Sequence, residues 1–79
     1  MTKFVEIDAI VEGSDGITTR TVFRAEDISA VIDLTPLLGM EGVPAGAKTV
    51  INLFVNAASK PAFAANTYDE VLERAGIER

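Results

Sequence analysis

The sequence has 79 residues, with 12 acidic and 7 basic side chains, a net charge of −5, and no Cys or His. A chain of this length forms one domain at most, so we expect residues 1–79 to fold as a single domain. The lack of Cys and His excludes disulfides and Cys/His zinc sites, and the acidic balance disfavours nucleic acid and anionic membrane surfaces as partners.

The apolar content is high for so short a chain. Hydrophobic residues make up 48% of it, and the mean hydropathy is +0.26. A domain of this size buries only about 60–65% of the surface that its unfolded chain exposes. We therefore predict that a second copy or a partner covers part of the apolar surface, and we expect a homo-oligomer. No apolar stretch approaches the roughly 18 residues of a membrane span, so we expect a cytoplasmic protein without a membrane partner.

Residues 3–12 alternate between apolar and acidic side chains, which predicts a half-buried strand. Its apolar positions are Val5, Ile7, Ala9 and Val11, and its acidic positions are Glu6, Asp8 and Glu12. Turn residues follow at 13–16, and residues 18–23 predict a second strand. A two-residue loop would place Arg20 and Arg24 on the apolar face. We therefore predict a three-residue loop with a left-handed Gly16, or a four-residue loop, so that both arginines meet the acids.

Three further segments complete the expected sheet. Residues 28–34 alternate again, with Ile28, Ala30, Ile32 and Leu34 on the buried face. Residues 35–47 contain two Pro and three Gly and predict a long loop. Residues 48–56 are apolar on both faces, which is typical of a central strand. After a turn at 57–61, residues 62–65 predict a short last strand, with Pro61 at its start or on an edge.

The last segment carries all the signals of a short helix. Thr67 and Glu70 predict a capping box, and Gly76 predicts the end, followed by the hydrophobic Ile77. One apolar stripe is formed by Tyr68, Val71, Leu72 and Ala75. A helix this short is unstable alone and must pack on the sheet. The sequence therefore predicts an α+β fold, a mainly antiparallel sheet of four or five strands covered by one C-terminal helix.

No pattern in the chain predicts catalysis. Without His and Cys, the usual general base, the thiolate nucleophile and the commonest transition-metal ligand are missing. The motifs G-x-S-x-G and S-x-x-K and a phosphate-binding Gly-rich loop are also absent from the sequence. The acids Asp69, Glu70 and Glu73 lie off the apolar stripe, where capping and solvation explain them. We expect a protein that is not an enzyme, with no catalytic residue, no cofactor and no metal.

Two groups of residues are candidate partner-binding sites. The first is the apolar part of the long loop, Leu37, Leu38, Met40 and Val43. These residues either close the end of the core as a lid or contact a second copy or a partner. The second group is Glu6, Asp8 and Glu12. These acids either pair with arginines across the sheet, or bind a basic protein, or collect a hard cation.

Three segments, VFRAEDISAVIDL (22–34), TVINLFVN (49–56) and NTYDEVLERA (66–75), follow one another in a familiar order. In this order the chain resembles the small flagellar FlbD-type proteins over about residues 18–75. The resemblance implies a non-catalytic accessory or adaptor protein in motility, without active-site residues. The chain departs from the family in its loop 35–47 and its turn 57–61, where the family has tight Asn-Gly hairpins.

These observations predict a small adaptor of bacterial or phage origin that acts by binding. Two alternatives remain open. One is an acidic phage-type inhibitor that occupies a basic groove of a host protein, and the other is a small-ligand-binding protein whose site forms between subunits.

Overall fold

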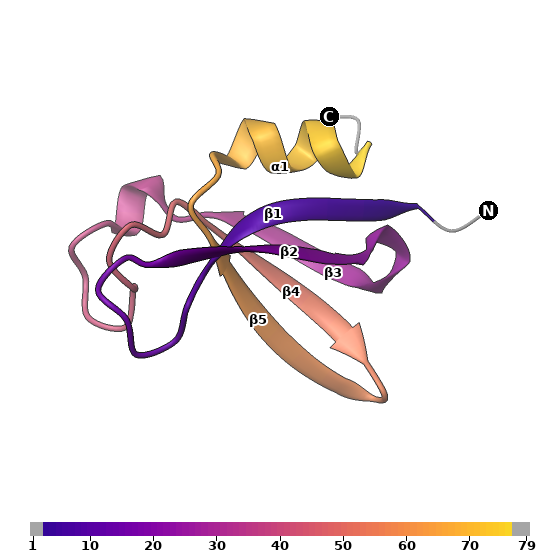
Figure 1. Ribbon diagram of the computed structural model, residues 1–79, viewed down its shortest axis with the longest axis horizontal. Helices are drawn as coiled ribbons and strands as arrows, with labels where there is room; N and C mark the ends of the chain where they lie inside the picture. The colour runs from indigo at the N-terminus through magenta and orange to yellow at the C-terminus, as the bar shows by residue number, and fades with distance from the viewer. Residues whose placement is uncertain (1–2, 77–79) are drawn as a thin grey trace.

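A computed structural model describes residues 3–76, which form one curled sheet covered by one helix (Figure 1). The strands are β1 (Phe4–Ile10), β2 (Thr18–Arg24), β3 (Ile28–Asp33), β4 (Thr49–Val55) and β5 (Ala58–Ala64), and the helix is α1 (Tyr68–Ala75). Two 3-10 turns, η1 (Ala25–Asp27) and η2 (Thr35–Leu37), flank β3. The five strands lie in the order β2-β1-β5-β4-β3, and every neighbouring pair is antiparallel. The predicted α+β class is confirmed.

In the hairpin of β1 and β2, odd-numbered positions pair with odd-numbered positions. This is the register that we predicted, with Arg20 and Arg24 on the same face as the acids. The loop of the hairpin is longer than predicted. The N–H of Val11 donates to the carbonyl of Ile17 at 2.8 Å, so residues 12–16 form the turn. The Ser14 hydroxyl supports this longer turn because it donates to the Val11 carbonyl at 2.6 Å and accepts from the Ile17 N–H at 3.2 Å. Gly16 has the predicted left-handed conformation, with φ of 83°.

The predicted alternation along β3 was wrong. Its register against β4 shifts after Ile28, which marks a β-bulge, and the Ser29 hydroxyl donates to the Asn52 carbonyl across it at 3.0 Å. A bulge adds one residue to its strand and so moves the following side chains to the opposite face. Val31 therefore packs with Ile28 against the core under the helix, while Ile32 is 43% exposed.

The turn between β4 and β5 was also predicted in the wrong place. Val55 lies opposite Ala58, and the two residues between them, Asn56 and Ala57, have φ of 53° and 62°. Two left-handed residues form a tight turn whose twist matches the strands. The chain therefore reverses at residues 56–57 and not over residues 57–61. As a result β5 begins at Ala58 and the hairpin extends away from the rest of the sheet (Figure 1).

We expect Ala57→Gly to raise the free energy of unfolding by about 0.5–1 kcal/mol, because the Cβ of alanine disfavours the left-handed conformation that glycine adopts freely. Urea unfolding at constant pH measures the change. Ala58→Gly, one residue further on in the extended strand, should lower stability instead. A loss of stability in Ala57→Gly would contradict a left-handed Ala57.

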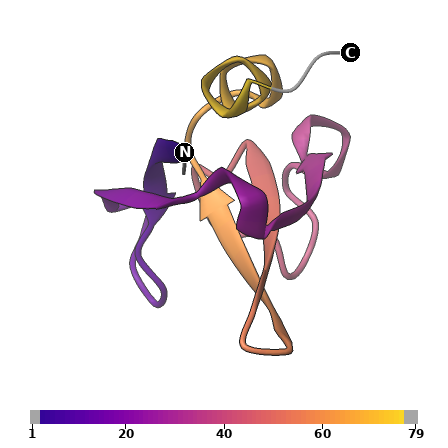
Figure 2. The ribbon, with the colours of Figure 1, turned by 90° about the vertical axis from the view of Figure 1, so that its right-hand side faces the viewer.

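The sheet has a core on each face. α1 covers one face of the sheet (Figure 2). The larger core lies beneath it, and its buried residues are Val5, Ile7, Ile51, Ala64, Val71 and Ala75. The smaller one is formed by the buried Leu34, Ala47 and Val50, with Ile10, Val43 and Phe63 packed against them. Ile51 and Val50 are adjacent and point to opposite faces, so β4 is covered on both sides, as predicted for a central strand. This cover ends before Phe54, which is 54% exposed.

The helix begins and ends as predicted. Thr67 and Glu70 form the capping box, and Gly76 caps the C-terminus with φ of 72°. Val71, Leu72 and Ala75 are buried against the sheet, which confirms that the helix packs on it. The prediction for Ile77 lies outside the described residues.

Candidate functional site

An apolar groove opens where β1 and β5 diverge. These strands pair at one position only, Ala9 opposite Ala64. Beyond that position, the end of β1 with the following turn forms one wall and the second half of β5 forms the other, around a volume of about 620 Å³. The lining consists of Ala9, Ile10, Val11, Glu12, Gly13, Ser14, Pro44, Pro61, Ala62 and Phe63. Val11, predicted on the buried face of β1, instead follows the strand and is 38% exposed in this groove.

The turn 12–16 and the loop 35–47 meet beside this groove, at the same end of the molecule (Figure 1). A Cβ placed on Gly46 would lie 3.7 Å from Cδ1 of Ile10 and 3.8 Å from Cα of Gly16, so the two segments are in close contact. Pro44 reaches the groove lining from the loop. We call the turn 12–16 together with the loop 35–47 the loop end.

The residues of the first candidate partner-binding group, all on the loop 35–47, differ in their exposure to solvent. Val43 is half-buried and packs against the smaller core, which fits the interpretation of the loop as a lid. Leu37, Leu38 and Met40 are 39%, 52% and 59% exposed, which fits the interpretation as a contact surface. The loop is held by successive backbone bonds, from Met40 N–H to Leu37 at 3.1 Å and from Val43 N–H to Met40 at 3.2 Å. The exposed side chains therefore stand on an ordered turn.

The second candidate group, the acids Glu6, Asp8 and Glu12, does not form one surface. Glu6 is exposed on β1, and its Oε1 lies 4.0 Å from Nε of Arg20, as the cross-strand hypothesis predicts. The same hypothesis was wrong for Arg24. This arginine stands at the end of β2 and pairs with Asp27 of η1 at 3.0 Å, because that acid is only three positions away. Glu12 lies in the turn beyond β1 and lines the groove.

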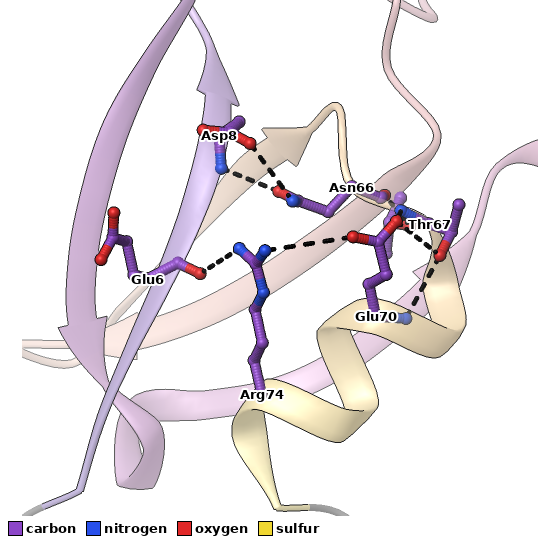
Figure 3. Close-up of polar contacts among 7 residues, drawn as sticks. Glu6, Asp8, Asn66, Thr67, Glu70 and Arg74 are labelled. Atoms are coloured by element: carbon purple, nitrogen blue, oxygen red, sulfur yellow. Dashed lines mark hydrogen bonds and ion pairs between the residues drawn. The ribbon is translucent and has the colours of Figure 1, made fainter.

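Asp8 belongs to a polar network centred on Asn66, which is 6% exposed (Figure 3). The Asp8 N–H donates to Oδ1 of Asn66 at 2.7 Å, and Nδ2 of Asn66 lies 3.4 Å from Oδ2 of Asp8. The Thr49 hydroxyl donates to the Asn66 carbonyl at 2.9 Å. Asn66 thus joins β1 and β4 to the start of the helix, and the carboxylate of Asp8 has a structural role. No local pattern in the sequence predicted this role of Asn66.

The helix also contacts β1 directly, beside the network of Asn66. Nη1 of Arg74 donates to the carbonyl of Glu6 at 3.0 Å, and Nη2 lies 4.0 Å from Oε2 of Glu70 (Figure 3). The Glu70 N–H donates to the Thr67 hydroxyl at 3.2 Å. Hydrogen bonds from the Thr67 backbone and side chain lower the pKa of the Glu70 carboxyl. Glu70 therefore caps the helix, which agrees with the structural interpretation of this acid.

Within residues 3–76, no three Asp or Glu side chains come together as metal ligands, and no helix is long and apolar enough to cross a membrane. No protein-family model matches the sequence, and no curated protein or solved structure is significantly similar to it. The resemblance to FlbD-type proteins stays a prediction. The groove and the exposed apolar side chains of the loop end are the strongest candidate site.

Proposed function

We propose that the protein is a non-catalytic interaction module that binds other protein chains through its loop end. The observation that carries the proposal is the exposure of Leu37, Leu38 and Met40 on a hydrogen-bonded loop, which also contributes Pro44 to the lining of an apolar groove. Exposed apolar side chains favour contact with another apolar surface over contact with water. Met and Leu side chains also adapt to the shape of a partner at low cost.

A second copy of the chain is the first partner that we propose. The buried cores are small, and no disulfide strengthens them, because the sequence has no Cys. Association that covers Leu38 and Met40 would add apolar burial that one copy lacks. Since both side chains are already partly packed, the gain is modest, and we expect self-association that depends on concentration.

We expect Leu38→Asp and Met40→Asp to shift the protein toward the monomer, because each places a charge in the proposed contact. Sedimentation velocity over a range of concentrations measures the mass. Thr18→Asp adds the same charge to an exposed position of β2 and should leave the mass of the wild type unchanged. Thermal unfolding checks that each variant is folded. A mass that is the same in wild type and in both loop variants would refute the loop interface.

In the cell, we propose that the protein acts as an adaptor in a cytoplasmic assembly. The FlbD-type resemblance implies motility as the setting.

A second candidate function is an inhibitor that binds a basic surface of another protein. The turn 12–16 and the loop 35–47 favour it, because they carry Glu12, Asp15 and Glu41 and no Lys or Arg. Complementary charge of this kind speeds the encounter of the two proteins and disfavours partners of the same charge.

A further inference from the structure

At the groove, the edge of β5 that faces β1 is unpaired within residues 3–76 and contains Pro61. Because the turn at Asn56 and Ala57 makes Val55 and Ala58 a hydrogen-bonded pair, the backbone groups of alternate residues, Pro61 among them, point away from β4. Proline has no N–H, so an added strand would lose one donor of the ladder at this point. The edge therefore resists extension of the sheet by another strand, and recognition there depends on side chains and on the remaining carbonyls.

The groove is lined mainly by apolar residues and carries one acid. Among the described residues that line it, Glu12 alone is ionisable. Asp15 and Glu41 are exposed elsewhere on the loop end. A long basic side chain would lie along the apolar wall with its charge beside Glu12.

We propose that the groove binds an extended segment of a partner protein in which apolar residues stand next to Lys or Arg. This inference rests on the proposed function, because it names the partner chemistry for the loop end. The apolar side chains would fill the volume between Val11 and Phe63, and the basic side chain would approach Glu12. A second copy fits this groove less well than a basic segment, since a two-fold contact here would bring Glu12 of each copy together.

A displayed library of random peptides about ten residues long, or roughly 33–36 Å when extended, tests the proposal on the full chain. We expect enriched peptides that combine apolar residues with Lys or Arg. Their binding should weaken as salt shortens the Debye length from roughly 30 Å at 0.01 M to about 8 Å at 0.15 M. Amide chemical shifts should move at residues 9–14 and at Ala62 and Phe63. Enrichment without basic residues, or no enrichment, would overturn the proposal.

Matched variants separate the groove from the rest of the surface. Glu12→Lys should weaken the selected peptide about five- to tenfold, because it replaces an attraction by a repulsion. Val11→Asp should also weaken it, by placing a charge on the apolar wall. Glu73→Lys makes the same charge change on the exposed face of α1 and should have no effect. Equal loss in the Glu12 and Glu73 variants would show non-specific attraction only and would overturn the site.

The same measurements on Leu38→Asp distinguish this proposal from the loop interface. Peptide binding that persists in a monomeric Leu38→Asp supports the groove as a separate binding surface. Groove amides that shift with protein concentration and not with peptide would assign the groove to a second copy and overturn the partner segment.

Discussion

Asn66→Ala is expected to lower the free energy of unfolding by about 2–3 kcal/mol, because it leaves the Asp8 N–H without its acceptor in a partly buried position. The asparagine is 6% exposed, and its Oδ1 accepts that N–H at 2.7 Å. Alanine keeps the backbone carbonyl that accepts from Thr49, so the effect reports the side chain alone. Urea unfolding followed by circular dichroism measures the change.

Asn52→Ala is the matched control for this experiment. Asn52 is half-buried on β4, and alanine retains the carbonyl that accepts from Ser29 at 3.0 Å. We expect a loss of at most about 1 kcal/mol there, since the backbone bond survives. Equal losses at the two asparagines would contradict the central role of Asn66 in joining β1, β4 and the helix.

Val71→Asp should abolish cooperative folding, because Val71 is 0% exposed in the core between α1 and the sheet. An unpaired carboxylate in an apolar core costs several kcal/mol, while a domain of this length has a total stability of roughly 4–12 kcal/mol. Without the helix face, the buried side of β1 would also meet water. Circular dichroism and amide NMR should show a chain without stable tertiary structure.

Two variants calibrate that result. Val71→Ala keeps an apolar residue and should cost about 1–3 kcal/mol, through lost contacts and the cavity left behind. Glu73→Ala, two positions further along the helix and exposed, should stay within about 0.5 kcal/mol of the wild type. If Val71→Asp unfolds as cooperatively as the wild type, the helix does not contribute to the core as described.

The elements that local sequence predicted well are those that short-range chemistry controls. The capping box of Thr67 and Glu70 and the left-handed Gly76 involve residues within one turn of helix. The alternation along residues 4–10 follows from the two-residue period of a strand and needs no knowledge of what covers it. The α+β class follows from adding these elements together.

Elements that depend on distant neighbours were missed or misplaced. The bulge in β3 reflects how that strand fits against β4, and it reversed the predicted exposure of Val31 and Ile32. The turn at Asn56 and Ala57 was hidden because alanine seldom adopts the left-handed conformation. Arg24 found its partner in Asp27 across η1, not on β1.

Local sequence was enough to predict the strand and helix periods, the helix ends and the acidic, apolar character of the loop segments, since each depends on residues a few positions apart. The tertiary structure alone decided that Asn66 meets Asp8, 58 positions away, and that β1 and β5 pair once and then separate. The groove exists because of that separation. Contacts between remote segments form only when the whole sheet closes around its cores, and no local pattern encodes which strand edges will meet.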